Sequence, residues 1–236
     1  MNANTKKTSV SRTLTSWYQD LFNHSKKNNH YERELTIAIC LALLVAGAYY
    51  GYRWHTNNKN AAAHVLFSQN LEELERVMQE GKQEDWASIQ TLFKLGYDQY
   101  PKSSLAPYFL AYQAQAMVKQ GQLEEAISTM HKAVDHMPSN SPVLGLYKTK
   151  AALMELDSAN TDTQKTALES LHAIAQDASS TAQDVAAYHL GLYYWMHNDA
   201  AQAKNVWTAL IEATHSKEKA GQSPWAAKAQ EKLMQI

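Results

Sequence analysis

Histidine, cysteine and acidic residues are the side chains of this sequence that could bind a metal ion or catalyse a reaction. The chain has ten histidines and one cysteine, Cys40, which lies in an apolar run. One cysteine excludes a disulfide within the chain and argues against a cysteine-based metal site. His131 and His136 are five residues apart, and His189 and His197 are more than two helical turns apart, so neither pair shares a helix face at the spacing of metal ligands.

The other elements of catalytic sites are also missing from the sequence. It has no H-E-x-x-H, no Gly-rich phosphate loop and no G-x-S-x-G. The adjacent carboxylates Glu72–Glu73 and Glu124–Glu125 are interpreted as solvated faces of helices. We therefore predict no catalytic residue, no metal, no cofactor and no small-molecule substrate, and we expect that the protein is not an enzyme.

Composition indicates which elements carry these side chains. Among 236 residues there are only 8 glycines and 5 prolines, and no run of alternating β-branched residues is bounded by turn signals. Such a chain favours helix throughout. The sequence predicts an all-α protein.

Charge is divided unevenly along the chain. Residues 1–34 carry six Lys/Arg and three Asp/Glu, whereas from Trp54 onward there are fifteen basic and twenty acidic residues. Because phosphate backbones are bound by basic surfaces, the acidic part argues against nucleic acid as a partner.

A membrane helix is predicted from the eighteen uncharged residues "LTIAICLALLVAGAYYGY". As a helix this run is about 27 Å long, roughly the thickness of the hydrocarbon core. Aromatic residues gather at its C-terminal end, as in an interfacial belt: Tyr49, Tyr50, Tyr52 and Trp54. We predict three parts: a basic tail 1–34, a transmembrane helix 35–54 and a helical domain 55–236.

Other interpretations of the apolar run stay open. Ala46-Gly47-Ala48 resembles a signal-peptide cleavage site, although 34 residues are long for the region that precedes a signal core. A lipoprotein is disfavoured because Ile39, before Cys40, is not small. The run could also be a buried core helix of a soluble protein.

The basic residues predict an orientation. Six lie before the span, whereas Arg53 and Lys59 are the only ones just after it. By the positive-inside rule, the N-terminus is cytoplasmic and the C-terminal domain lies across the membrane, which in a bacterium is the periplasm of the inner membrane. The tail itself has an apolar stripe that predicts either an interfacial helix or a chance pattern in a disordered tail: Leu14, Trp17, Tyr18, Leu21 and Phe22.

A helical repeat is indicated by "QGQLEEAISTMHKAVDHMP". Gly121, Ala126, Ala133 and Pro138 follow one another at spacings of five, seven and five, and Ala114 precedes them. These residues resemble the tetratricopeptide family, whose units of about 34 residues form two helices with small residues where the helices cross. The resemblance implies a unit over 107–140.

A second unit is predicted over 184–217. In "YHLGLYYWMHNDAAQAKNVWTALIEA", Gly191, Tyr194 and Ala203 match the small and bulky positions of the motif. Asn198 replaces the turn glycine, which is tolerable because Asn also adopts left-handed conformations. Together the units predict a tetratricopeptide-like solenoid.

Two further units are degenerate. In 141–180, Ala167 takes the small position, and the loop "DSANTDTQ" is expected to add about seven residues. Upstream, Ala87 is expected to take the same position, with a first helix over about 61–80. The residues after Ser223 predict a closing helix, as the end of a solenoid requires.

A partner-binding groove is predicted on the first helices of the two clear units. The resemblance implies that these helices line the groove of the solenoid. The candidate residues are Tyr108, Tyr112, Gln115 and Lys119 on one helix, and Tyr188, Leu192, Trp195 and Met196 on the other. The alternative is that neighbouring helices bury both stripes.

The whole arrangement resembles one family. A short tail, one span and a tetratricopeptide-like domain, with "GYRWHTNNKNAAA" and the ending "SPWAAKAQEKLMQI", are similar to the YfgM-like ancillary subunits of the SecYEG translocon. The resemblance implies a periplasmic domain that binds the translocon, nascent secreted chains and periplasmic chaperones. The alternative is a structural subunit of another envelope assembly, such as a secretion or division complex.

Overall fold

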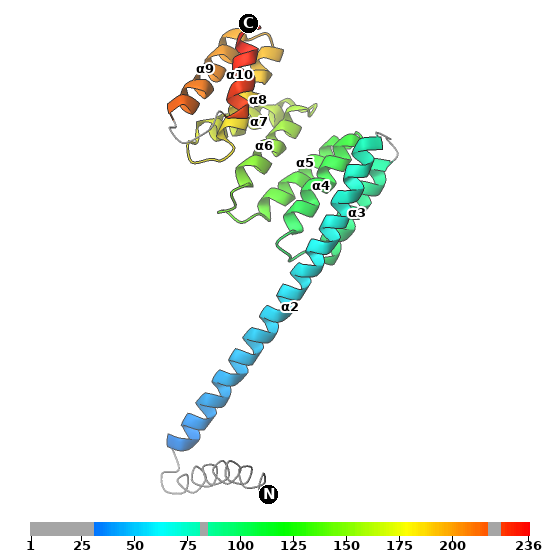
Figure 1. Ribbon diagram of the computed structural model, residues 1–236, viewed down its shortest axis with the longest axis vertical. Helices are drawn as coiled ribbons and strands as arrows, with labels where there is room; N and C mark the ends of the chain where they lie inside the picture. The colour runs from blue at the N-terminus through cyan, green and yellow to red at the C-terminus, as the bar shows by residue number, and fades with distance from the viewer. Residues whose placement is uncertain (1–30, 81–84, 217–222) are drawn as a thin grey trace, which may run out of the picture. The chain divides into compact units, whose positions relative to one another are not determined.

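The protein is all-α over the residues that the computed structural model describes, which are 31–80, 85–216 and 223–236. The apolar stripe predicted within residues 14–22 lies outside them. Nine helices occur in the described ranges (Figure 1). They are α2 (Tyr31–Glu80), α3 (Trp86–Gln99), α4 (Ala106–Lys119), α5 (Leu123–Asp135), α6 (Leu144–Leu156), α7 (Thr161–Gln176), α8 (Gln183–Met196), α9 (Ala200–Ser216) and α10 (Pro224–Leu233).

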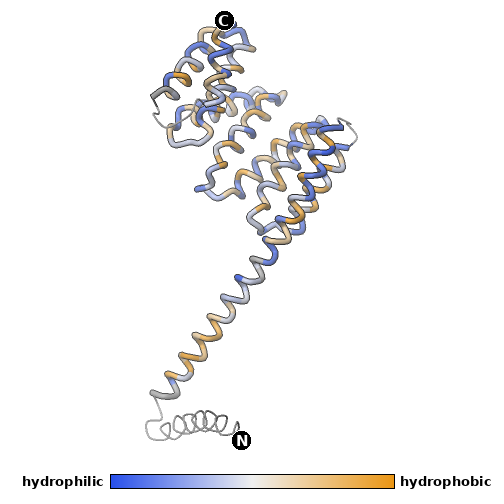
Figure 2. The backbone as a smooth tube through the Cα atoms, viewed as in Figure 1, coloured by the Kyte–Doolittle hydropathy of each residue, from blue (hydrophilic) through white to orange (hydrophobic). Residues whose placement is uncertain are grey.

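Helix α2 is a single helix of 50 residues that contains the predicted span. It is long and apolar enough to cross a membrane by length and composition, and Figure 2 shows its hydrophobic stretch. None of this stretch is buried by the described residues. Leu44 and Val45 are about 70% exposed. The chain divides into two compact units, one ending at Asn58 and the other beginning at Lys59, so residues 59–80 of α2 belong to the helical domain.

The helices of the domain pack in pairs in chain order, as in a helical repeat (Figure 1). Helices α4 and α5 form one pair, α6 and α7 the next, and α8 and α9 the last. The apolar core is likewise divided into neighbouring clusters, each shared by three consecutive helices. The protein therefore buries a continuous core in steps rather than around one centre.

The pair α4–α5 confirms the spacing of small residues. Ala114, Ala126 and Ala133 are fully buried where the two helices cross. Gly121 adopts a φ of 77°, a left-handed conformation that glycine reaches at little cost. Pro138 follows the end of α5, in an exposed turn.

The pair α8–α9 forms the same crossing with different residues. Asn198 adopts a φ of 61°, as predicted for the replacement of the turn glycine. A Cβ on Gly191 would lie 2.3 Å from Nε1 of Trp207, so this glycine makes room for the indole. Ala203 is fully buried beside Trp207, and Tyr194 packs against the same cluster.

The predicted register of the first pair was wrong. Ala87 is exposed, and the buried residues of α3 are Ile89, Phe93 and Gly96. They are separated by four and three residues, as Ala126, Met130 and Ala133 are in α5. Gly96 is the small residue of this set, because a Cβ there would lie 2.2 Å from the ring of Phe109. The first helix of the pair is the C-terminal part of α2, whose Asn70 donates a hydrogen bond to the carbonyl of Leu92.

The second half of the long loop predicted in the third unit is helical. Helix α7 begins at Thr161, so only 157–160 connect α6 to α7. The side chain of Asn160 accepts hydrogen bonds from the backbone N–H groups of Asp162 and Thr163. This N-cap stabilises an early start of α7, and the extra residues lengthen the helix.

The predicted closing helix is present as α10. It packs against α9 and α8, and it buries Ala226 and Ala229 in the cluster of Trp207. The helix thereby covers apolar surface that the last pair would otherwise expose.

Candidate interaction surface

The stripe predicted on α8 is largely covered by its neighbours. Tyr188 stacks on Trp207 and lies 5.3 Å from the ring of Trp225, measured between ring centroids. Trp195 lies 6.5 Å from Trp207, and the ammonium of Lys232 lies 4.5 Å from the Trp195 ring. Helices α9 and α10 therefore hold these rings in place.

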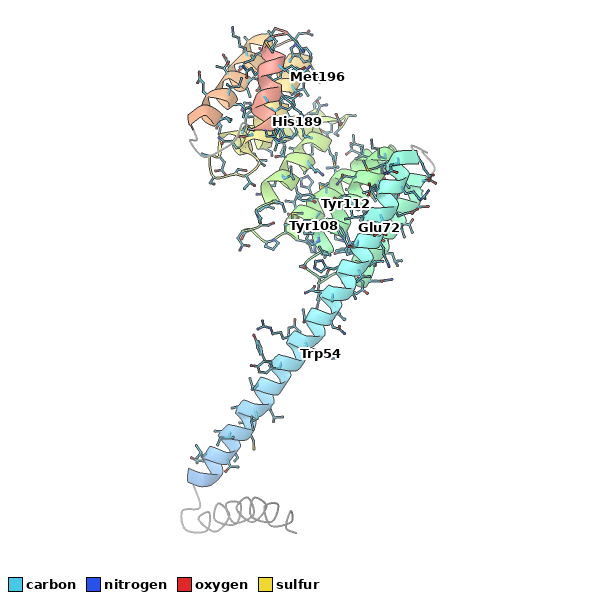
Figure 3. All side chains as sticks on the ribbon, viewed as in Figure 1. Trp54, Glu72, Tyr108, Tyr112, His189 and Met196 are labelled. Carbon is cyan, nitrogen blue, oxygen red and sulfur yellow. The ribbon has the colours of Figure 1, made fainter. Side chains whose placement is uncertain are left out.

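Two members of the α8 stripe differ in exposure. Leu192 is half-buried against the same cluster, whereas Met196 is 71% exposed at the C-terminal end of the helix (Figure 3). The structure thus leaves Met196 as the freely accessible residue of this stripe.

The stripe predicted on α4 is half-buried and aromatic. Tyr112 stacks on Phe93 at 5.1 Å and meets Phe67 edge-on at 5.7 Å. Tyr108, one turn earlier (Figure 3), meets the ring of Tyr147 on α6 edge-on at 5.7 Å. The tyrosines of α4 therefore join the first pair to the third helix pair.

The polar members of the α4 stripe lie further along the helix. The Gln115 amide donates a hydrogen bond to the carbonyl of Ala111 in its own helix. The Lys119 ammonium lies 5.8 Å from the Trp86 ring at the start of α3, and the side chain is exposed. Gln115 is half-buried and Lys119 is exposed, and they lie about two and three helical turns after Tyr108.

Sequence reasoning missed two residues of this surface, Tyr147 and Lys150. Both lie on α6, and the Lys150 ammonium is 5.4 Å from the Tyr147 ring. Burial, and then the neighbouring Tyr112 and Tyr108, raises the pKa of Tyr147 to about 12. Burial alone lowers the pKa of Lys150. We call Tyr108, Tyr112, Tyr147 and Lys150 the donor cluster.

A repeated position connects the donor cluster to α8. Tyr112 stands two residues before Ala114, Lys150 two before Ala152, and His189 two before Gly191. Those three small residues are buried where each first helix meets its second helix. The equivalence of Ala114, Ala152 and Gly191 was the signal that could have found Lys150 from the sequence.

His189 occupies the last place of this row and is half-buried. Its ring lies 5.5 Å from that of Trp225 on α10. Burial, and then the positive charge of Lys228, lowers its pKa. The imidazole therefore favours its neutral form more than a solvated histidine does.

Several histidines take structural roles between helices. His131 on α5 pairs with Glu155 on α6, and the hydroxyl of Ser158 donates to Glu124 at 2.8 Å. His172 bonds the hydroxyl of Tyr194 at 2.6 Å. Glu124, predicted as part of a solvated face, therefore helps to join two helix pairs.

Metal-binding groups do not gather in the described part of the chain. Over 31–80, 85–216 and 223–236, no three His, Cys, Asp or Glu side chains converge as the ligands of an ion would. Two hollows lie between neighbouring helix pairs. One, of about 340 Å³, is lined by α5, α6 and α7, and the other, of about 370 Å³, is lined by α7, α8 and α9. Their walls combine alanine and aliphatic side chains with several polar ones, and the first hollow includes the paired His131 and Glu155.

Comparison with known proteins identifies no family for this chain. No protein-family model matches the sequence, and no curated protein matches it either. The resemblance to YfgM-like proteins therefore stays a prediction.

Proposed function

We propose that this protein is a membrane-anchored scaffold that binds other polypeptides through its helical repeat. The observation that carries the proposal is helix α2. Its apolar stretch is unburied by the described chain, and the same helix supplies Asn70 and Phe67 to the packed core of the repeat domain. An anchor and a repeat domain on one helix suit a protein that works at a membrane surface.

The first helices of the repeat favour binding of polypeptides. They present half-buried aromatic rings together with exposed apolar side chains, such as Leu146 on α6 and Met196 on α8. Aromatic residues supply large contact areas at a low cost in conformational entropy. A surface of this kind suits extended chains of varied sequence.

The finer proposal places the repeat domain in the periplasm beside the SecYEG translocon. It rests on the basic tail, which favours a cytoplasmic N-terminus, and on the resemblance to YfgM-like proteins. In this role the domain binds emerging secreted chains and passes them to periplasmic chaperones.

A second candidate is a structural subunit of another envelope assembly. It is favoured by the coverage of the α8 stripe, where Tyr188 and Trp195 are already packed against α9 and α10. A domain with few free groove residues would suit one fixed partner better than many transient ones.

Site-specific crosslinking separates these functions. A photoreactive phenylalanine at Met196 would be tested in the full-length protein, in membranes that contain a stalled secretory chain. The matched control carries the same group at Lys94, which is exposed on α3. Helix α3 is the second helix of its pair and does not carry the predicted groove. We expect adducts to the stalled chain from 196 and not from 94.

The other outcomes of this experiment are equally informative. An adduct to one stoichiometric envelope protein, unchanged by the secretory chain, would support the structural subunit instead. Equal adducts from both positions would contradict a specific groove.

A further inference from the structure

The donor cluster gathers hydrogen-bond donors from two neighbouring first helices. Tyr108 and Tyr112 come from α4, and Tyr147 and Lys150 come from α6. Tyr108 and Tyr147 are in edge-to-face contact, and the Lys150 ammonium lies 5.4 Å from the Tyr147 ring. The Tyr147 hydroxyl is protonated at neutral pH, as tyrosine hydroxyls ordinarily are, so that this group can donate.

Among the residues that the structure describes, these donors have no acceptor. Over the described residues, the three hydroxyls form no hydrogen bond and Lys150 forms no ion pair. None of their polar atoms is fully buried without a partner, so each reaches solvent. The cluster therefore consists of the buried Tyr147 and the half-buried Tyr108, Tyr112 and Lys150, and its polar atoms are accessible to a ligand from outside.

The unpaired ammonium determines the charge of that ligand. A partly desolvated cation without a counter-ion is unfavourable, and an anion placed beside it offsets the cost. Carboxylates accept several hydrogen bonds at once, and bonds between charged partners are about twice as strong as neutral ones. The chemistry of the cluster is thus complementary to a carboxylate.

The position of Lys150 in the row of Tyr112, Lys150 and His189 indicates whether the carboxylate belongs to the interior or to the end of a bound polypeptide. Lys150 is the middle member of the row, with Tyr112 on α4 before it and His189 on α8 after it. Contacts between α4 and α6, and between α6 and α8, make the row continuous. A ligand that follows the row extends on both sides of Lys150, as the interior of a polypeptide does and a chain end does not.

We infer that the donor cluster binds the carboxylate of an aspartate or glutamate side chain within an extended polypeptide segment that crosses α4, α6 and α8. The inference rests on the proposed function, since it names the chemistry that the scaffold recognises in its partners. Tyr108, Tyr112 and Tyr147 donate to the carboxylate oxygens, and Lys150 supplies the opposite charge.

The test uses full-length protein in detergent micelles and three pools of nine-residue peptides with random Ala, Ser, Leu and Tyr flanks. The first pool has a central Glu and blocked ends, the second a central Gln and blocked ends, and the third a central Gln and a free C-terminal carboxylate. Fluorescence anisotropy measures the affinity of each pool. We expect the Glu pool to bind at least about tenfold more tightly than the Gln pool, as loss of one charge-assisted bond implies.

Variants assign the effect to the cluster. Lys150→Met keeps the length of the side chain and removes its charge, and it should abolish the preference for Glu. Lys148→Met is the matched control, because Lys148 is exposed on the same helix and lies outside the cluster. Tyr147→Phe removes only a hydroxyl and should reduce the preference about threefold to tenfold. Circular dichroism confirms that each variant is folded.

Each outcome supports or overturns the inference. Equal binding of the Glu and Gln pools would overturn it while leaving polypeptide binding intact, as would a preference that survives Lys150→Met. Tight binding of the third pool alone would show that the cluster binds chain ends. Failure of all pools to bind, together with no adduct from Met196 to a secretory chain, would overturn the proposed function as well.

Discussion

The pairs α4–α5 and α8–α9 form the same type of helix crossing with different distributions of side-chain size. In α4–α5 the small residues are shared, with Ala114 on the first helix and Ala126 and Ala133 on the second. In α8–α9 the first helix contributes Gly191, and the second contributes the fully buried Trp207. The crossing therefore depends on the summed size of the facing side chains, and the glycine of the first helix in α8–α9 accommodates a larger residue on the second.

This difference in side-chain size also changes how strongly the stability of each crossing depends on one residue. The indole N–H of Trp207 donates to the carbonyl of Tyr188 at 3.0 Å, and its ring contacts Tyr188 and Trp195. The core between α4 and α5 is instead divided among several small and medium side chains. We expect the last pair to be the more sensitive to single substitutions.

The largest effect is expected from Trp207→Ala. Removing a fully buried indole leaves a cavity and deletes its hydrogen bond to the Tyr188 carbonyl, so the free energy of unfolding should fall by about 3–5 kcal/mol. Urea denaturation of the full-length protein in micelles measures the change. Met196→Ala, at an exposed position, is the control and should change it by less than about 0.5 kcal/mol. A loss below 1 kcal/mol for Trp207→Ala would show that the last pair does not depend on the indole.

Gly191→Ala should cost about 1–3 kcal/mol, because the added methyl overlaps the indole. Combining it with Trp207→Leu tests the complementarity directly. The double variant should lose less stability than the sum of the two single variants, since the smaller side chain makes room for the methyl. Additive losses would contradict the interpretation that Gly191 and Trp207 are matched in size.

The turns of the two pairs allow a smaller and symmetric test. Gly121→Ala should cost about 1 kcal/mol, since a Cβ there meets nothing within 4 Å and the penalty is that of the left-handed conformation. Asn198→Ala should cost a similar amount, whereas Asn198→Gly should be neutral or slightly stabilising. Thermal unfolding midpoints measure these changes. A destabilising Asn198→Gly would indicate that the Asn side chain has a further role.

The smallest effect concerns pH and the last pair alone. Because the pKa of His189 is lowered in the folded protein, the unfolded chain binds its proton more readily. The contribution of His189 to stability is therefore complete above its ordinary pKa of about 6.5 and declines as the pH falls toward the lower folded value. Urea midpoints at pH 7.5 and 5.5 should differ less in His189→Gln than in the unaltered protein. An equal shift of the urea midpoint with pH in both proteins would contradict the interpretation that half-burial favours the neutral imidazole of His189.

The α4–α5 pair could be predicted from sequence because its glycine, alanines and proline all stand at the expected spacing. The register of α3 was missed, because Ile89 fills a position that is usually small and Gly96 supplies the space instead. The spacing from Ile89 to Pro101 equals that from Ala126 to Pro138, and this proline would have corrected the register.

The interaction surface was predicted less completely, for a related reason. Tyr108 and Tyr112 were found because their unit matches the motif, whereas Tyr147 and Lys150 lie in a unit without a turn glycine. The coverage of Tyr188 and Trp195 depends on where α10 packs, which local spacing does not determine. Whether these residues bind a partner stays a prediction.

The central proposal, an anchored protein with its repeat domain across the membrane, is tested most directly by protease accessibility in a bacterial host. Intact cells and spheroplasts would be treated with protease, and the mass of the untreated chain would be measured in parallel. The proposal predicts protection in intact cells, digestion of the domain in spheroplasts, and an untreated chain that retains its N-terminal tail. A domain that stays protected in spheroplasts, or a chain cleaved after Ala48, would contradict it.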